Sequence, residues 1–277
     1  MPPNLTRIHV FDVEHGECSI IETPTGRTIM IGAGHNGFTA WRPSTWLANR
    51  RLPLTKVVLT NLDRDHASDL PSFEPAARPS ALFWNFNISP DWMTALKLEE
   101  SGRVDPGVRI ALHWMKNVFT GGPANIDYGL DVRHFYHPPT KFQDTNNLSV
   151  VTFIFYAGVG IIFPGDLERA GWEEFLKDPA FRDCLARTTI FIASHHGRIN
   201  GYCSEVFKYC APALVIISDK PVVHDTQDHN RYQDHAEGLM FGSDRKKVLT
   251  TRNDGKITID VAATGQYTVY INKDTRQ

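Results

Sequence analysis

The sequence has few cysteines and almost no net charge, and both features narrow the possible functions. Its four cysteines show neither CxxC spacing nor a dense framework, so we expect reduced, buried thiols in a cytoplasmic protein and not a disulfide scaffold. The formal net charge is −2 and the pI is about 6.6. No overall basic field therefore gathers nucleic acid or anionic lipid, and any nucleic-acid binding must come from local patches.

Long apolar runs and internal repeats are also missing. No run approaches the about 18 apolar residues that a membrane-spanning helix needs. The first residues, MPPNLTRIHVFDV, lack the charged and apolar regions of a signal peptide. A chain of this length can bury a large core without disulfides, and no linker-like stretch divides it. We therefore expect residues 1–277 to form one domain with no membrane contact.

Strand patterns alternate with helix patterns along the chain, which predicts the α/β class. The predicted strands are residues 6–13, 18–23, 27–34, 56–60, 188–194 and 213–218, a pair within 148–166, short strands near Leu82, Val108 and Val132, and an all-strand tail over 247–271. The predicted helices are residues 44–51, 90–101, 169–177 and 204–210. This order indicates two sheets with helices on the outside.

Polar clusters follow three of the apolar strands: TNLDRDH (60–66), PGD (164–166) and SHHGR (194–198). Strand ends at one edge of a sheet converge, so we expect one cleft lined by Asp63, Asp65, His66, Asp166, His195 and His196. Carboxylates this close repel each other unless a cation offsets them. Carboxylate and imidazole ligands without thiolate suit Zn²⁺ or Mn²⁺. The sequence therefore predicts a metal centre of one or two ions.

Five segments resemble successive motifs of the metallo-β-lactamase superfamily: FDVEHGECSIIETPTGRTIMIGAG, VVLTNLDRDHASDL, NNLSVVTFIFYAGVGIIFPGD, ASHHGRINGYCSEVFKYCAPALVIIS and TTRNDGKITI. They are most similar to the branch that contains the hydrolase domain of the DNA-uptake competence channel protein. The resemblance implies an αββα four-layer sandwich that carries the metal centre at one edge of its sheets.

The resemblance also implies roles for the metal-site residues. Asp65, His66 and one histidine of the HHG pair would hold one metal ion, with Asp166 as the bridging, catalytic carboxylate. His195 is favoured because it comes first after its strand, although the sequence leaves His196 open. Asp63 would belong to a second ion.

Two positions depart from the motifs of the branch. Asn61 stands where its first ligand histidine is expected, and Gly32 stands where its IDAG turn has an acid. An amide oxygen is a weak ligand for a transition metal. We therefore expect one tightly bound ion and a second, weaker one, with His35 as a candidate to fill the missing place.

Further residues are candidates for substrate contact. NRYQDHAEG resembles the Asn-Arg-Tyr-Gly-His of the branch, which implies His235 as a proton donor to the leaving oxygen. Arg64 and Arg198 could grip phosphates, and His224 and Asp225 lie in a polar segment suited to line the cleft.

The function predicted is that of a metal-dependent hydrolase, foremost a phosphodiesterase or nuclease that acts on nucleic acid or nucleotides through a metal-activated water. An ester or phosphorylcholine hydrolase would use the same ligands. The alternative is a metal-poor pseudoenzyme that serves as a sensor or binds partner proteins within a multi-component system.

Overall fold

Two β-sheets form the centre of the protein, which a computed structural model describes over residues 4–74, 76–122, 124–220 and 230–272. Within these residues, seven strands form the first sheet, in the order β15 (Tyr267–Asn272), β14 (Lys256–Ala262), β1 (Leu5–Val10), β2 (Ser19–Glu22), β3 (Thr28–Ile31), β4 (Lys56–Val58) and β5 (Ala81–Phe83). Six strands form the second sheet, in the order β13 (Val248–Thr250), β10 (Leu214–Ile217), β9 (Ile190–Ile192), β8 (Val159–Phe163), β7 (Val151–Tyr156) and β6 (Asp131–Phe135). A separate hairpin pairs β11 (Leu239–Phe241) with β12 (Asp244–Lys246).

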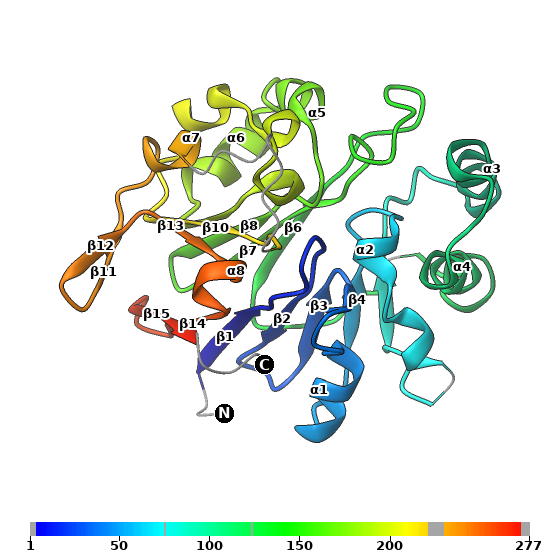
Figure 1. Cartoon of the computed structure of the whole chain (residues 1–277), viewed down its shortest axis with the longest axis horizontal. Helices are drawn as coiled ribbons and strands as arrows, with labels where there is room; N and C mark the ends of the chain where they lie inside the picture. Colours follow the sequence, from blue (N-terminus) through cyan, green and yellow to red (C-terminus); the bar gives the residue numbers. More distant parts are fainter. Residues whose placement is uncertain (1–3, 75, 123, 221–229, 273–277) are drawn as a thin grey trace.

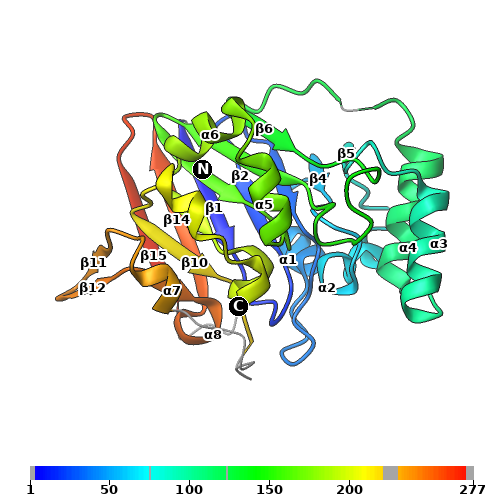
Figure 2. The same ribbon diagram turned by 90° about the horizontal axis from the view of Figure 1, so that it is seen from above.

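Helices cover the outer face of each sheet (Figure 1). The helices beside the first sheet are α1 (Pro43–Asn49), α2 (Arg64–Ala67), α3 (Pro90–Ser101) and α4 (Pro106–His113). Those beside the second sheet are α5 (Arg169–Phe175), α6 (Pro179–Ala186) and α7 (Asn230–Gln233). Figure 2 shows α3 and α4 side by side at one end of the molecule. The four-layer αββα sandwich expected from the sequence is thereby confirmed.

Short helical turns complete the layers. They are η1 (Leu70–Phe73), the π-helical turn η2 (Trp114–Val118), η3 (Ser194–Gly197), η4 (Ile199–Gly201), η5 (Ser204–Lys208) and α8 (Thr251–Asp254). The segment predicted as a helix over 204–210 is thus a 3₁₀ turn.

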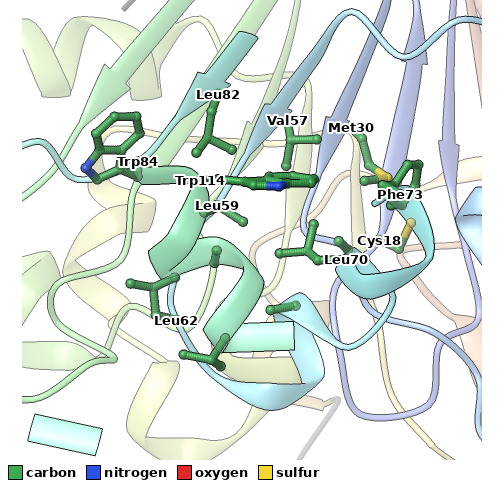
Figure 3. Close-up of a cluster of buried hydrophobic side chains, with 14 of the residues drawn as sticks. Cys18, Met30, Val57, Leu59, Leu62, Leu70, Phe73, Leu82, Trp84 and Trp114 are labelled. Carbon is green, nitrogen blue, oxygen red and sulfur yellow. The ribbon is translucent and has the colours of Figure 1, made fainter. Parts of the chain in front are cut away.

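Separate apolar clusters fill the spaces between the layers. Side chains of both sheets, such as Ile8 of β1 and Ile161 of β8, form the cluster between them. The outer face of the first sheet packs on its helices around Trp114, which Figure 3 shows among Val57, Leu59 and Leu70. Strands buried on both faces need continuous apolar runs, which explains why several strands read as unbroken stretches of Val and Ile.

Two further predictions about local structure were wrong. The segment near Val108 is helix α4 and not a strand, because Asp105 and Pro106 start a helix whose buried face includes Val108, Ala111 and Leu112. The tail is not a simple meander either. Strand β13 pairs in parallel with β10 of the second sheet, and α8 lies between it and β14.

The predicted state of the cysteines is confirmed, since all four are buried free thiols. No helix in the described ranges is both long and apolar enough to cross a membrane.

Parallel pairing brings the polar clusters together. Strands β3, β4 and β5 run parallel to one another, and so do β8, β9 and β10. The segments that follow β4, β8 and β9 carry the sequence clusters, so parallel neighbours within each sheet deliver them to the same edge of the sandwich.

Candidate metal centre

Four side chains from the two sheets meet at this edge. Asp65 and His66 belong to α2, which follows β4, whereas Asp166 follows β8 and His196 lies in η3 after β9. Each of the four offers one ligand-type atom, and these atoms all lie within 4.8 Å of one another. We call Asp65, His66, Asp166 and His196 the four-residue cluster.

The carboxylate of Asp166 lies between the two imidazoles of the cluster. Its Oδ2 is 3.1 Å from His66 Nε2, and its Oδ1 is 3.3 Å from His196 Nε2. Asp65 Oδ2 is 3.5 Å from His196 Nε2 and 3.9 Å from His66 Nε2. His66, Asp166 and His196 are buried, whereas the Asp65 side chain is 36% exposed. The cluster therefore opens to solvent on its Asp65 side.

Contacts outside the cluster fix the orientation of His66. Its Nδ1 lies 3.0 Å from Thr60 Oγ1 and 3.2 Å from Glu17 Oε2. The Thr60 hydroxyl donates to the same Glu17 oxygen, so the hydrogen of the imidazole lies on Nδ1. In the neutral imidazole, Nε2 would carry the lone pair and face the cluster, as in the carboxylate–histidine–metal arrangement of metalloproteins.

His196 reaches the cluster through an unusual turn. His195, His196 and Gly197 all have left-handed backbone, with φ of 50°, 56° and 75°. Such a conformation costs a residue with a side chain about 1–2 kcal/mol. The Nδ1–H of His196 donates to the carbonyl of Ser218 at 3.1 Å, so Nε2 again faces the cluster.

The sequence favoured His195 as the ligand of the HHG pair, but the imidazole that joins the cluster is that of His196. The left-handed turn directs His195 away, where its Nδ1 is 3.5 Å from Glu168 Oε1 and its Nε2 accepts from Arg198 Nη1 at 3.3 Å. Burial lowers the pKa of His195, so it is neutral at pH 7.

The charges of the cluster favour a cation. Burial by itself would lower the pKa of His66, but Asp166 and Asp65 outweigh burial and raise it well above 6.5. Burial would also lower the pKa of His196, but Asp166 and Asp65 outweigh burial and raise this pKa to about 9. Burial would raise the pKa of Asp166, yet the two imidazoles hold it well below 3.8. Without another cation, the carboxylates draw protons onto the imidazoles.

The four side chains fit a divalent metal ion. His66 Nε2 and Asp166 Oδ1 are buried and have no hydrogen-bond partner outside the cluster, so their contacts are with the other ligand-type atoms of the cluster. Two imidazoles and two carboxylates are a ligand set that suits Zn²⁺ or Mn²⁺. Each imidazole turns its Nε2 to the centre, so a metal ion that displaces the proton on Nε2 would meet the neutral form that binds a metal.

Asp63 is not brought into the cluster. Its Oδ1 accepts from Lys97 Nζ at 2.5 Å, and its Oδ2 accepts from Thr145 Oγ1 at 3.0 Å. Asn61 is buried, and its Oδ1 accepts from the backbone N–H of Asp63 at 3.2 Å. The expectation that Asp63 serves a metal ion conflicts with these contacts, since a lysine already neutralises it.

His35 does not fill the missing ligand place. Its Nδ1 lies 2.7 Å from Ser68 Oγ. His235 Nε2 lies 2.7 Å from Tyr202 Oη, and its ring stacks on Phe207 at a centroid distance of 4.1 Å. The cluster found among the described residues includes neither histidine.

The residues predicted to contact substrate differ in their exposure and contacts. Arg64 is exposed beside Asp65 in α2, so it remains a candidate. Arg198 is partly buried and contacts His195. His224 and Asp225 lie outside the described residues.

Sequence reasoning missed Glu17 and Lys97, which contact His66 and Asp63. It also gave no role to His15, whose ring centroid lies 5.4 Å from that of His196. The signal for Glu17 was an acid directly before the strand pattern CSII, a place where burial of a charge needs a partner.

No protein-family model matches the chain, and no curated protein matches it significantly. Among solved structures, the chain is similar to Igni18, a novel metallo hydrolase from the hyperthermophilic archaeon Ignicoccus hospitalis KIN4/I. The TM-score is 0.49 at 16% identity, over 97% of this chain and 100% of that chain. It is also similar to Zn²⁺-bound PqqB from Methylobacterium extorquens, with a TM-score of 0.34 at 15% identity, over 64% of this chain and 56% of that chain. Similarities this distant concern the course of the chain and not its chemistry.

Proposed function

We propose that the protein is a metal-dependent hydrolase of the metallo-β-lactamase type that cleaves phosphodiesters in nucleic acid or nucleotides. The observation that carries the proposal is the four-residue cluster, in which Asp65, His66, Asp166 and His196 offer ligand atoms within 4.8 Å of one another. Both imidazoles are held with Nε2 toward the centre. His66 Nε2 and Asp166 Oδ1 have no hydrogen-bond partner outside the cluster, and a bound cation would satisfy both of these buried polar atoms.

Asp65, His66, Asp166 and His196 would hold a divalent cation, which would supply Lewis-acid polarisation of the substrate and an activated water. The chain itself contributes orientation and exclusion of solvent. Asp166 and the two imidazoles are buried, so they stay fixed while substrate approaches from the exposed side of Asp65. The Asp65 carboxylate is placed to accept a hydrogen bond from the attacking water. His235 contacts Tyr202 and Phe207, and its role as a proton donor to the leaving oxygen stays a prediction.

The phosphodiester class is supported by the charges around the opening. Arg64 is exposed and adjacent in sequence to Asp65, which suits contact with a phosphate. The net charge of −2 provides no long basic surface for duplex DNA. Short or single-stranded nucleic acid, or a nucleotide phosphodiester, is therefore the preferred substrate.

The test combines metal content with hydrolysis of bis(p-nitrophenyl) phosphate by the same preparation. We expect metal-loaded wild type to cleave it, and Asp166→Asn to lose both metal and turnover. Asp183→Asn changes an exposed acid of α6 and should keep both. The proposal would be refuted if wild type bound no metal, or if Asp166→Asn hydrolysed the substrate as fast as wild type.

A second candidate, a binding module without catalysis, is favoured by the contacts of Asp63 and Asn61, which leave neither group facing the cluster. Metal retention without cleavage of phosphodiester, carboxylic ester or phosphorylcholine substrates would support it. Cleavage of an ester alone would keep the hydrolase and change its substrate class.

A further inference from the structure

Lys97 is a buried cation that contacts an acid of the predicted metal motif. It lies in α3, and the residue is 7% exposed. Its Nζ donates to Asp63 Oδ1 at 2.5 Å, to Glu100 Oε2 at 2.8 Å and to Thr145 Oγ1 at 3.4 Å. All three hydrogens of the ammonium group therefore have oxygen acceptors, a number that matches its donor capacity.

The same contacts use both oxygens of Asp63. Lys97 takes Oδ1, and the hydroxyl of Thr145 donates to Oδ2 at 3.0 Å. Burial by itself would lower the pKa of Lys97, but Asp63 and Glu100 outweigh burial and raise it. The lysine is thus a permanent positive charge at neutral pH, and the Asp63 carboxylate is already compensated.

A second divalent ion does not fit on this side. Asp63 lies two residues before Asp65, where a second ion was expected, but an ammonium group already binds it. Asn61 offers an amide oxygen that accepts from the Asp63 backbone. A cation placed against Asp63 would have to displace the Lys97 ammonium or be repelled by it.

We propose that Lys97 is a built-in cation that replaces a second metal ion beside the four-residue cluster, so that the protein has a centre with a single metal ion. This inference rests on the proposed function, because it presupposes that the cluster binds metal. Removal of the lysine would leave the oxygen atoms of Asp63, Glu100 and Thr145 that now accept from its ammonium group. Such a set suits Mn²⁺ or Mg²⁺ better than Zn²⁺, so the loss of Lys97 should create a second site.

Calorimetric titration of the metal-free full chain with Mn²⁺ and with Zn²⁺ tests the inference, because it measures the number of metal equivalents that each chain binds. Wild type should bind about one equivalent of either metal, as a single set of ligands predicts. Lys97→Met keeps the apolar stem and should gain a second Mn²⁺ equivalent. Lys97→Met combined with Asp63→Asn should return to one equivalent. Lys116→Met removes an exposed lysine that pairs with Asp91 and should stay at one.

Two equivalents bound by wild type would overturn the inference, and so would a folded Lys97→Met that still binds one. If Lys97→Met fails to fold, Asp63→Asn alone decides, because it should leave the wild-type stoichiometry unchanged. Loss of a bound equivalent in Asp63→Asn would make Asp63 a metal ligand and refute the role of Lys97. A wild type that binds no metal would instead refute the proposed function, and the inference with it.

Discussion

At the residue scale, contacts outside the cluster set the tautomer of each imidazole. Glu17 and Thr60 do this for His66, and the carbonyl of Ser218 does it for His196. Partners of this kind are typically worth 10- to 100-fold in metal affinity, because they orient the ring and increase its basicity. Substitution of such a partner should therefore lower metal affinity although all four ligand side chains remain.

The first prediction concerns Glu17. Glu17→Gln removes the charge that His66 Nδ1–H faces, so we expect affinity for Zn²⁺ to fall about 10- to 100-fold. The matched control is Glu22→Gln, which changes the acid paired with His9 on β1 at 3.1 Å. Calorimetric titration of the metal-free proteins measures both. Equal affinities of Glu17→Gln and Glu22→Gln would contradict the role assigned to Glu17.

The sequence predicted most of the cluster but not its complete membership. Asp65, His66 and Asp166 could be found because each follows an apolar strand. The choice between His195 and His196 depends on two successive left-handed residues, which no pattern of side chains announces. Lys97 could not be found either, since its partner Asp63 lies 34 residues away and a lysine on a helix is normally exposed.

At the scale of elements, glycines let two segments approach the backbone that carries Asp65. A Cβ added to Gly34 would lie 2.3 Å from the carbonyl oxygen of Asp65, and one added to Gly16 would lie 2.7 Å from it. Both distances are shorter than real side chains tolerate. The position of α2 therefore depends on the absence of these side chains.

The second prediction follows from this close approach. Gly34→Ala must push the Asp65 backbone aside, so we expect weaker metal binding and a loss of about 1–3 kcal/mol in the free energy of unfolding. Gly121→Ala is the control, because nothing lies within 4 Å of its added Cβ. Denaturant unfolding and metal titration of both variants provide the check. Normal metal affinity in Gly34→Ala would show that the helix can move without harm.

Gly32 has a structural explanation of the same kind. Its φ is 66°, and an added Cβ would lie 2.3 Å from the carbonyl oxygen of Glu17. The turn therefore has no room for the acid that the sequence motif suggested. The carboxylate near His66 comes from Glu17 instead.

Elements with clear end signals were predicted well. Helix α3 matches its expected range because Ser89 caps its start and Gly102, in left-handed conformation, ends it. The elements predicted wrongly are those whose place in the fold depends on which strand they pair with. Strand β13 has the same apolar pattern whichever sheet it joins, so its pairing with β10 could not be read from the sequence.

At the scale of the whole molecule, the cluster joins the two halves of the sandwich. Asp65 and His66 follow a strand of the first sheet, whereas Asp166 and His196 follow strands of the second. A bound ion would therefore link the two sheets. Since an ion that binds only the folded state stabilises it, metal should raise the melting temperature.

The third prediction is that the metal-free protein loses stability as the pH rises. The folded-state pKa of His196 is raised to about 9, above an unfolded value of about 6.5. Its contribution is therefore complete below pH 6.5 and disappears as the pH rises through 9. For His196 alone this is about 3 kcal/mol, and His66 shifts in the same direction.

Thermal unfolding of metal-free and metal-loaded protein between pH 6.5 and 9 measures this effect. The loaded protein is the control for all other titrating groups, including Lys56, whose pKa burial lowers to about 8. The difference in melting temperature between the two forms should widen as the pH rises. A constant difference would mean that the imidazoles of the cluster are not protonated when the metal is absent.

The most direct test of the metal centre is the metal content of His196→Ala beside His195→Ala. The two variants remove neighbouring histidines of one turn, but only His196 lies in the cluster. Proteins purified without chelator should contain about one Zn or Mn per chain in wild type and His195→Ala, and clearly less in His196→Ala, because that variant loses one of the two imidazole ligands of the cluster. Loss of metal from His195→Ala with retention in His196→Ala would contradict the account.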